Sequence, residues 1–458
     1  MKLGTTLFLL LASACCFLKG CEADSKLIPS SVIDEAPITI EKEETVNVVE
    51  QPEEIFESEI KEVKDEYVKP LAVEPRALEA RAIGCKVSIR GGLPQRQPIY
   101  IQTNSSEFYP YDASGNMVFD AGEEFDLHCP KAFSSISKSL ITASCVSGTN
   151  FKVDGTTYSF KELTCTSWPA FIAEKTGDTC EGGIAVRVGF KVSSSRFIEQ
   201  YNLCFNEDEE VTRYVHHTLI PGGNFYETGV ERLTFGTGDL FNGKKVDNLY
   251  KTARQIATIN ADLGGDADKY FQANKNIFLS RGHMAAKADF TYANQQRATF
   301  LFVNIAPQWQ VFNAGNWAKV EDGVRAKVTK AGWYVDCYTG VYGVTTLPNI
   351  DGVETPLYLS RDANNNGLIP VPMLYFRVVI ERTSQKGIVF VGVNNPHLTL
   401  EQIQADYILC TDVSDRVNYI NWKPTDIMAG YSYACEVSDF KSQVENLPEL
   451  SAPGGLLL

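Results

Sequence analysis

The sequence predicts an α+β protein whose mainly antiparallel sheet is flanked by helices and preceded by a small, disulfide-tied β-rich module. Three observations support this fold class. Short apolar runs separated by Gly, Asn, Asp and Ser fill residues 85–200, as in an all-β segment. Two strands and a helix follow in that order between 277 and 330. Apolar runs at Met373–Ile380 and Ile388–Val391 then predict central strands.

The chain begins with the features of an exported protein. Met1 and Lys2 precede an apolar run from Leu7 to Leu18, which predicts a secretory signal peptide over residues 1–23. No later segment has the ~20 apolar residues that a transmembrane helix needs. We therefore expect a secreted, extracellular protein with no membrane partner.

An acidic segment, residues 24–81, follows the predicted signal peptide. It has sixteen acidic and seven basic residues, no cysteine and no sustained periodicity, which is typical of disorder. Because it ends near Arg76 and Arg81, we interpret it as a propeptide that a trypsin-like protease removes at one of these arginines. A solvated acidic tail without a regulatory role is an equally good interpretation of its composition.

The cysteines indicate an oxidising compartment. Nine of the twelve lie beyond the predicted signal peptide and none forms a Cys-x-x-Cys pair, which favours disulfides over zinc. We expect Cys410 to pair with Cys435 and at least three further bridges to form. The odd ninth thiol is free, pairs between chains or pairs with Cys21. Asn104, in Asn-Ser-Ser, is a predicted glycosylation site.

Two domains are expected after the acidic segment. Residues 82–200 form the predicted β-rich module, and six of the nine cysteines lie between 85 and 204. Residues 201–458 form the predicted second domain, with the boundary placed between 195 and 212.

The second domain has a predicted order of helix, strand, strand, helix. Apolar residues at helical spacing predict a helix over Val246–Gly264. Strands are predicted at Ile277–Leu279 and Thr299–Val303. A helix over Gly315–Lys330 follows, with three apolar side chains on one face: Trp317, Val320 and Val324.

Polar side chains suited to phosphodiester chemistry gather between 280 and 321. One of only five histidines stands in Ser280-Arg281-Gly282-His283, and Asn304, Asn313 and Glu321 follow. A neutral imidazole can take a proton from water, and a hard cation held by oxygen ligands can neutralise charge on a phosphate. The combination indicates cleavage of a phosphodiester bond.

This block resembles the DNA/RNA non-specific endonucleases of the ββα-metal (His-Me finger) type, whose signature is Asp-Arg-Gly-His. Arg281–Phe290 and Gln295–Phe300 are similar to the secreted arthropod branch, which includes digestive and salivary nucleases and insect enzymes that degrade double-stranded RNA. The resemblance is strongest from about Tyr214 to Phe440. It departs at Ser280, an uncharged residue where the signature has aspartate. It implies a ββα-metal core, a Mg²⁺ cofactor that Mn²⁺ can replace, and secretion into gut lumen or saliva.

The resemblance implies a role for each polar residue of the block. His283 is the general base, unless it is a histidine satisfied in the core. Asn313 binds Mg²⁺, caps the helix that follows, or does both. Glu321, eight residues further along the helix, holds metal-bound water, unless it is an ordinary solvated glutamate. Asn304 orients the loop and assists the site, or simply anchors a turn, and Arg281 contacts the scissile phosphate.

Four further residues are predicted substrate contacts. Arg232 is the candidate for a more distant phosphate-binding arginine. Lys287, Gln296 and Arg297 are candidate contacts to nucleic acid and equally plausible as ordinary surface residues. The loop Gly238–Lys245 nearly matches a P-loop, but Lys245 replaces the hydroxyl that the motif needs.

The charge distribution limits the kind of nucleic-acid binding that is expected. The net charge is −15, of which the acidic segment carries −9 and the signal region +1, so that residues from 82 onward carry −7. This excludes a strongly basic, sequence-reading DNA-binding domain. We predict a sugar-non-specific endonuclease that hydrolyses DNA and/or RNA, double-stranded RNA included, to 5′-phosphate products. The competing prediction is a catalytically silent nucleic-acid-binding or scavenging protein with the same fold.

Overall fold

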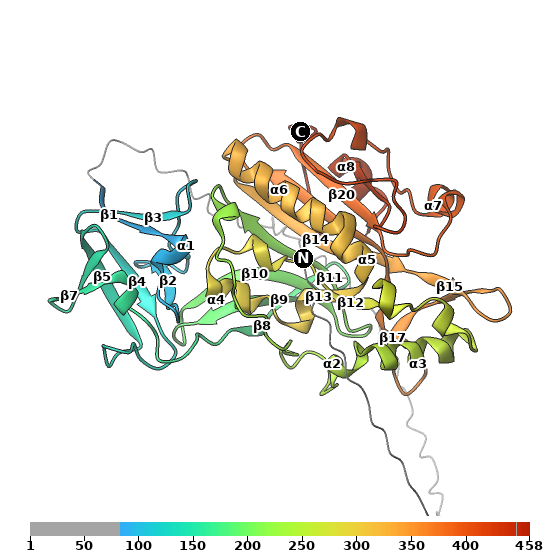
Figure 1. Ribbon diagram of the computed structural model, residues 1–458, viewed down its shortest axis with the longest axis horizontal. Coiled ribbons are helices and arrows are strands. Elements are labelled where there is room, and N and C mark those ends of the chain that lie inside the picture. The colour runs from blue at the N-terminus through green and yellow to red at the C-terminus, as the bar shows by residue number, and fades with distance from the viewer. Residues whose placement is uncertain (1–82, 446) are drawn as a thin grey trace, which may run out of the picture. The chain divides into compact units, whose positions relative to one another are not determined.

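The computed structural model describes residues 83–445 and 447–458 (Figure 1). The predicted signal peptide and acidic segment, with Arg76 and Arg81, lie outside the described residues. So does Cys21.

The first part of the described chain is a small β-module. Strand β1 (Ile83–Ser88) pairs with β3 (Asn116–Asp120), and five further strands form an antiparallel sheet in the order β2-β4-β5-β6-β7. Packed aromatic rings fill its core, including Phe119, Phe125 and Phe151. The sheet strands are β2 (Ile99–Gln102), β4 (Glu124–His128), β5 (Leu140–Ser147), β6 (Asn150–Val153) and β7 (Thr156–Ser159).

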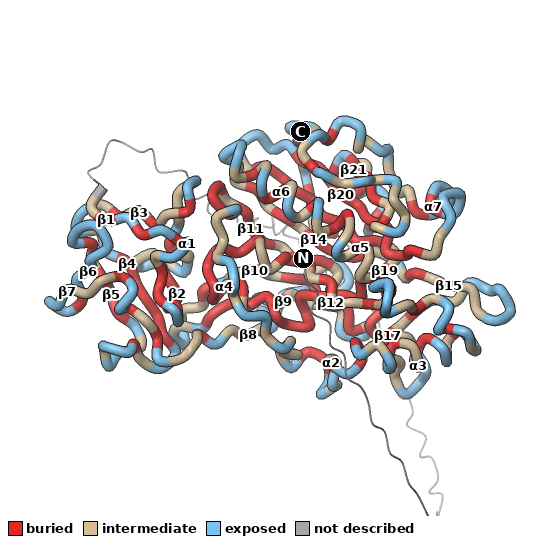
Figure 2. Tube along the Cα trace, viewed as in Figure 1, coloured by how far each residue is buried: buried red, intermediate tan, exposed pale blue. Residues whose placement is uncertain are grey.

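An eight-stranded antiparallel sheet forms the centre of the second part, in the order β21-β20-β19-β14-β11-β10-β9-β8. Burial follows these strands through the molecule (Figure 2). The strands are β8 (Ile172–Cys180), β9 (Gly183–Lys191), β10 (Phe197–Asn206), β11 (Val211–Leu219), β14 (Val335–Val344), β19 (Pro372–Glu381), β20 (Gly387–Val393) and β21 (Ser432–Cys435).

The sheet corrects the expected boundary between the two parts. Strands β8, β9 and the first four residues of β10 lie before residue 201 and were expected in the β-module, yet they pair within the eight-stranded sheet. The change from one sheet to the other therefore lies between β7 and β8, before Ile172, and not at 195–212. Period-2 patterning identified these segments as strands but does not specify which sheet a strand joins.

The two faces of the central sheet carry different packing partners. In β19, Tyr375, Arg377 and Val379 face the helix α6 (Ala318–Ala331) and a hairpin described below. Leu374, Phe376 and Val378 alternate with them and pack with the C-terminal region, including α7 (Leu400–Asp406) and α8 (Val437–Lys441). This alternation is the period of two expected for a strand buried on both faces.

Helix α6 covers one face of the sheet (Figure 1). Its buried residues Val320, Val324 and Val328 recur at helical spacing and pack against Val379 and Phe390. Trp317 is also buried, which confirms the predicted apolar face.

Other predicted helices and strands are shifted. The helix predicted over Val246–Gly264 is two helices, α2 (Val246–Leu249) and α3 (Thr252–Leu263), and α3 ends at Gly264 in the left-handed conformation (φ +71°). The second strand predicted at Thr299–Val303 is wrong, because Phe302–Asn304 form a 3₁₀ turn and the strand β13 begins at Ile305. The aromatic and β-branched residues of Thr299–Val303 are buried as a connection and do not extend the sheet.

The remaining described elements are short. Two further two-stranded sheets pair β15 with β16 and β17 with β18. These strands and the short helices are β15 (Thr346–Pro348), β16 (Glu354–Pro356), β17 (Tyr358–Arg361), β18 (Gly367–Pro370), α1 (Ile89–Gly92), α4 (Ala293–Ala298) and α5 (Gln310–Phe312).

Four disulfides confirm the expected cysteine chemistry. Cys410 pairs with Cys435 as predicted, and Cys337 is a free, buried thiol. Of the alternatives for the odd cysteine, a buried unpaired thiol is the one that the structure shows. The other three bridges are Cys85–Cys145, Cys129–Cys165 and Cys180–Cys204.

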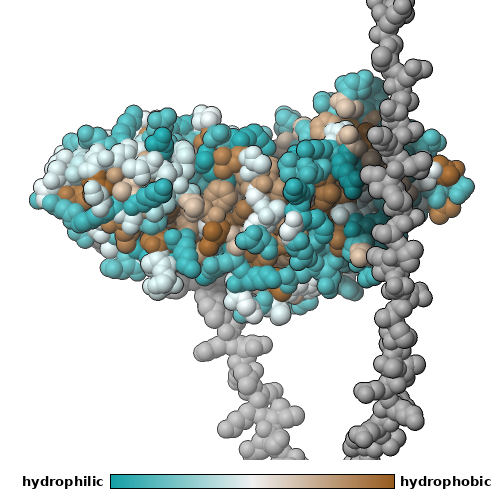
Figure 3. Space-filling model, turned by 90° about the horizontal axis from the view of Figure 1, so that it is seen from below, coloured by the Kyte–Doolittle hydropathy of each residue, from teal (hydrophilic) through white to brown (hydrophobic). Residues whose placement is uncertain are grey.

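Several large apolar side chains are exposed on the described part of the chain. On the face shown in Figure 3, hydrophilic side chains surround limited apolar patches. None of the helices within 83–445 and 447–458 is long and apolar enough to cross a membrane. The large apolar side chains exposed in this part are Leu140, Val146, Ile172, Ile350, Val353, Leu400, Met428 and Leu458.

The β-module contacts the segment that follows His283. Thr291 donates a hydrogen bond to the Tyr111 hydroxyl (2.6 Å), and the Tyr292 hydroxyl donates to the Tyr109 carbonyl (2.9 Å). Asn294 donates to the Pro98 carbonyl (2.7 Å). The module therefore supports the chain a few residues beyond the Arg-Gly-His sequence.

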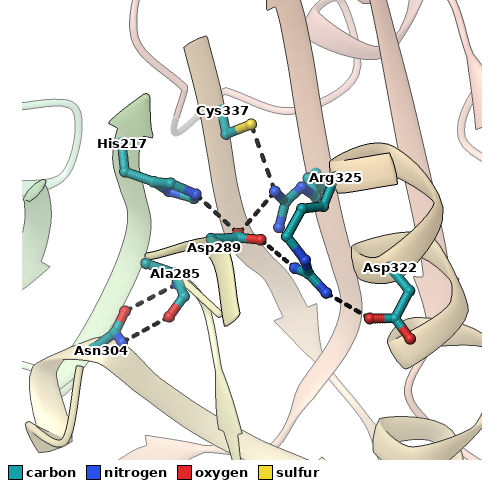
Figure 4. Close-up of polar contacts among 8 residues, drawn as sticks. His217, Ala285, Asp289, Asn304, Asp322, Arg325 and Cys337 are labelled. Carbon is teal, nitrogen blue, oxygen red and sulfur yellow. Dashed lines mark hydrogen bonds and ion pairs between the residues drawn. The ribbon is translucent and has the colours of Figure 1, made fainter. Parts of the chain in front are cut away.

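A buried carboxylate, Asp289, joins this segment to the sheet and to α6 (Figure 4). One oxygen accepts from Arg325 Nη1 (2.6 Å), and the other accepts from Arg377 Nη2 (2.9 Å) and lies 3.0 Å from His217 Nε2. Asp289, His217 and Arg377 have fully buried side chains. Burial lowers the pKa of His217, so the neutral ring donates to the carboxylate.

Asp289 is therefore an ionised acid in the interior. Burial favours its neutral form, but Arg377, His217 and Arg325 outweigh burial and hold its pKa far below the usual range. Breaking a buried ion pair by removing one partner typically costs ~3–5 kcal/mol, because it leaves an uncompensated buried charge. Here, loss of the carboxylate would leave two buried arginines facing each other.

We expect Asp289→Asn to lower the free energy of unfolding by ~3–5 kcal/mol at neutral pH. The lowered pKa stabilises the fold above the unfolded-state pKa of ~3.9, and this contribution is lost as pH falls below it. The gap between wild type and variant should therefore be full above about pH 4 and close on further acidification.

Denaturant titrations from pH 3 to 7 measure that gap. Asp154→Asn is the matched control, because Asp154 pairs with Lys138 at 2.7 Å but is 60% exposed. The control should change stability by no more than ~1 kcal/mol. Equal stability losses in the two variants would contradict the assigned role of Asp289.

Candidate active site

A two-stranded hairpin presents the Arg-Gly-His sequence. Strand β12 (Leu279–His283) pairs antiparallel with β13 (Ile305–Trp309), with Gly282 opposite Ala306 and His283 opposite Ile305. The sequence Arg281-Gly282-His283 was expected just after a strand, but it lies within one. A Cβ on residue 282 would come within 2.4 Å of Gln308 Oε1 and 2.7 Å of the Tyr375 hydroxyl, so only glycine fits there.

His283 lies between aromatic rings and cations. Its ring centroid is 5.4 Å from those of both Phe235 and Phe300. The residue keeps some exposure, whereas Nε2 is covered and has no hydrogen-bond partner within the described chain. Burial, Arg232 and Lys287 lower the pKa of His283 from its usual value to about 3. The imidazole is therefore neutral at physiological pH, with an unpaired nitrogen.

Arg232 and Lys287 are the cations beside His283. Arg232 is exposed, and its guanidinium lies 5.4 Å from the centre of the Phe300 ring. Lys287 donates to the Val230 carbonyl (2.7 Å), and burial together with Arg232 lowers its pKa. Backbone bonds from Gly236 to Phe300 and from Phe302 to Gly236 hold the loop that brings Arg232 here. Because Arg232 lies about fifty residues before His283, the spacing in the sequence does not show that the two side chains are close.

Asn304 anchors the chain after His283. Its Oδ1 accepts from the Ala285 backbone N–H (2.9 Å), and its Nδ2 donates to the carbonyls of Ala285 (3.0 Å) and Thr299 (3.1 Å) (Figure 4). The side chain is fully buried. Both ends of the amide are thus committed to backbone, which matches the anchoring alternative and leaves no group for the substrate.

Asn313 does not cap a helix. It follows α5 and starts a π-helical turn, Asn313–Trp317. Asn313 itself has helical backbone angles (φ −54°, ψ −47°), and its side chain makes no cap bond. π-Turns of this kind occur frequently at functional sites. Its Nδ2 donates to Ser280 Oγ (3.0 Å), and Ser280 Oγ donates to the Gln308 carbonyl (2.9 Å). The amide nitrogen is thereby held, and among the described residues no hydrogen bond engages the oxygen Oδ1.

The C-terminal loop shapes this π-turn. Asn316 donates to the carbonyls of Lys423 (2.8 Å) and Gly430 (2.7 Å), and its backbone N–H donates to Ala429. A Cβ on Gly315 would lie 2.4 Å from the Ala429 carbonyl oxygen. Asn313 is therefore positioned by contacts from more than a hundred residues further along the chain.

Glu321 lies on α6 beside the Asp289 cluster. Burial and the negative charge of Asp289 raise its pKa to about 8, although Arg377 and Arg325 oppose the shift. Burial, Tyr250 and the charge of Glu321 together raise the pKa of Tyr375, whose hydroxyl adjoins Gly282 and donates to the Ala306 carbonyl (2.8 Å). Glu321 is thus partly buried and electrostatically linked to the hairpin, unlike an ordinary solvated helix glutamate.

Arg281 is held on three sides. Its Nη2 donates to Asp247 Oδ1 (2.7 Å), and its guanidinium lies 5.2 Å from the Tyr250 ring centre and 5.9 Å from that of Phe235. Its Nε is buried and has no partner within the described residues. One donor of the guanidinium is therefore still available to an anion.

Two predicted substrate contacts have structural roles instead. Gln296 is 1% exposed and donates to the Glu227 carbonyl (2.9 Å), so the prediction of a substrate contact at this position is wrong. Arg297 pairs with Glu231 (3.0 Å) and lies 4.5 Å from the Trp168 ring centre, with only 13% of its side chain exposed. Both residues sit in α4, whose inner face the surrounding chain covers.

Asn104 is exposed in a turn, where a glycan would fit without displacing other residues. Glycosylation at this position stays a prediction.

Several residues of the site have no signature in the sequence. Asp247, Tyr250 and Phe235 come from segments 31 to 46 residues before Arg281 and meet it only in the fold. Asp289 stands in the stretch that resembles the arthropod enzymes, so its presence there was the one available signal.

The side chains near Asn313 offer few ligands for a metal ion. Among the described residues, no group of three or more His, Cys, Asp or Glu side chains is arranged to hold one. An ion here would rest on a single protein oxygen, Asn313 Oδ1, and on water. This fits Mg²⁺, which keeps several waters, and does not fit zinc.

Comparison with known proteins identifies the family. A sequence model of the DNA/RNA non-specific endonucleases matches residues 181–440. A salivary endonuclease of Lutzomyia longipalpis is 33% identical over 310 residues, which make up 66% of this chain and 70% of that protein. The salivary protein Tsal1 of Glossina morsitans morsitans is 22% identical over 365 residues, or 78% of this chain and 89% of that protein.

A solved structure is also similar. The EndoG/EndoGI complex matches with a TM-score of 0.29 and 21% identity, over 44% of this chain and 73% of that chain. This TM-score is too low to support a structural inference, so the family assignment rests on the matched family model and on the sequence identity. The family consists of metal-dependent nucleases. The chain therefore belongs to the DNA/RNA non-specific endonuclease family and is a phosphodiester hydrolase.

Proposed function

We propose that this enzyme is a secreted, Mg²⁺-dependent endonuclease that cleaves DNA and RNA, double-stranded RNA included, and leaves 5′-phosphate ends. The observation that carries the proposal is the neutral imidazole of His283 beside Arg232 and Lys287, whose Nε2 has no hydrogen-bond partner in the described part of the chain. A neutral base next to cations is suited to deprotonating water in contact with a polyanion.

The proposed proton transfer begins at His283. Its Nε2 takes a proton from the water that attacks the phosphorus. Arg232 and Lys287 keep the ring neutral before the substrate arrives. A bound phosphate offsets their charge, which raises the basicity of the ring when it is needed.

Arg281 and Asn313 complete the proposed site. Arg281 offers guanidinium donors to the non-bridging phosphate oxygens. Asn313 Oδ1 would hold the metal ion, Ser280 would fix the orientation of the amide, and Glu321 would hold water at the ion. When bound, Mg²⁺ supplies positive charge that stabilises the phosphate and the leaving oxygen.

We expect wild-type enzyme to degrade double-stranded RNA, double-stranded DNA and single strands in a gel assay, and EDTA to abolish the activity. His283→Ala should lower kcat by ~10²–10⁴-fold with little change in nucleic-acid affinity, because only the base is lost. Added imidazole should restore part of the rate.

His128→Gln, in strand β4 of the β-module, is the matched control and should retain activity. A His283→Ala enzyme with normal turnover, or a wild type unaffected by EDTA, would instead favour a silent nucleic-acid-binding protein.

The proposed metal ligand has its own test. Asn313→Ala should lower activity and raise the Mg²⁺ concentration for half-maximal rate, because it removes the protein's direct ligand. Ser280→Ala removes only the group that orients the amide, and outer-shell changes of this kind cost up to ~10-fold in metal affinity in the milder cases. Ser280→Asp keeps an acceptor for Asn313 Nδ2 and should stay close to wild type. Mg²⁺ titrations of initial rate compare the four proteins, and identical midpoints would contradict metal binding at Asn313.

The acidic segment is a proposed inhibitory propeptide. Its carboxylates resemble a polyanion and would occupy the cationic site until a trypsin-like protease cleaves after Arg76 or Arg81. The protein beginning at Ala82 should therefore turn over faster at low salt than the protein beginning at Asp24, and added salt should reduce the difference. Equal rates at low salt would leave the acidic segment as a solvated tail.

A further inference from the structure

Asp247 forms an ion pair with Arg281, the residue that the proposed function assigns to the scissile phosphate. Its Oδ1 accepts from Arg281 Nη2 at 2.7 Å, and its backbone carbonyl accepts from the same nitrogen at 3.3 Å. The Asp247 side chain is 46% exposed and that of Arg281 is 29% exposed. The ion pair therefore lies at the surface of the site, within reach of a ligand.

The segment around Asp247 is fixed by its neighbours. Val246 and Leu249 of α2 are buried on either side of it, as is Tyr250 just after the helix. Lys244 forms an ion pair with Glu210, whose side chain is 1% exposed. The loop that nearly matches a P-loop thus has a structural role, because its Lys244 holds the start of α2 near Glu210. In that position the Asp247 carboxylate of α2 points at Arg281.

Arg281 does not depend on Asp247 alone for its position. The rings of Tyr250 and Phe235 lie against its guanidinium, and its buried Nε has no hydrogen-bond partner among residues 83–445 and 447–458. An unpaired buried donor is costly, and an incoming anion oxygen would satisfy it. The two rings therefore orient the guanidinium and Asp247 neutralises its charge, while its Nε–H still lacks a hydrogen-bond acceptor among the described residues.

We propose that Asp247 is a positioning residue that competes with the substrate phosphate for Arg281 and thereby weakens nucleic-acid binding. This rests on the proposed role of Arg281. A nuclease without sequence specificity must release its products, and a carboxylate that replaces the departing phosphate on Arg281 favours release. The same carboxylate keeps the free site from retaining other anions.

Asp247→Asn should bind nucleic acid about two- to fivefold more tightly, the range that corresponds to a half-exposed ion pair. The slope of log affinity against log salt should steepen by up to about one, because one more cation then contacts phosphate without compensation. Binding is measured with short labelled RNA and DNA duplexes in the His283→Ala background, so that the probes stay intact. In the active enzyme the change should appear as a lower KM, whereas a merely disordered site would lose kcat.

Three comparisons keep the test specific. Asp154→Asn removes the same charge from a more exposed ion pair in the β-module and should leave affinity unchanged. Asp247→Glu keeps the carboxylate and should bind like wild type. In an Arg281→Gln background, Asp247→Asn should have no effect, since the two residues act through one interaction.

The outcomes separate this inference from the proposed function. If Arg281→Gln does not weaken binding, the assignment of Arg281 to the phosphate is wrong. If Arg281→Gln weakens binding but Asp247→Asn leaves affinity unchanged or lowers it, the competition is overturned and the phosphate-binding role of Arg281 stands.

Discussion

The ionised Asp289 carboxylate holds together the parts of the molecule on which the active site depends. It accepts from Arg377 on β19, Arg325 on α6 and His217 on β11, and it belongs to the chain six residues beyond His283. Burying one acid with two arginines has a large desolvation cost, which is offset only when the geometry of the bonds is well satisfied. The helix and the segment after the hairpin are therefore confined to one arrangement.

The geometry of the active-site residues follows from that constraint. Glu321 lies one helical turn before Arg325, so anchoring the arginine also places the glutamate. Tyr375, two residues before Arg377 on the same strand, directs its hydroxyl to the hairpin beside Gly282. A single interior charge thus sets the positions of the acidic residue on α6 and of the strand that carries His283.

The local field at the site differs in sign from the charge of the whole chain. The net charge is −15, yet His283 is surrounded by Arg232, Lys287 and two aromatic rings. Burial and these two cations keep the imidazole neutral, and the cations attract anions over short distances, while an acidic remainder limits long-range retention of nucleic acid. The pairing of Arg281 with Asp247 follows the same pattern, because it lowers the charge that the free site presents.

Local patterns along the chain were enough to identify the fold class, the Arg-Gly-His sequence and the disulfide-rich character. Periods of two and 3.6 identified strands such as β19 and the face of α6, because they are local consequences of backbone geometry. Arg281, Gly282 and His283 were recognisable for a similar reason, since their chemistry requires those residues side by side.

The hydrogen-bond partners of the polar residues become visible only in the tertiary structure. Asn304 and Gln296 lie in the same short stretch as His283, but their amides bond buried backbone. The assignment of β8 to β10 to the central sheet, the π-turn at Asn313 and the partners of Asp289 depend on contacts between residues up to about a hundred positions apart. Hydrogen-bond partners and burial arise from these long-range contacts, which leave no periodic trace along the chain.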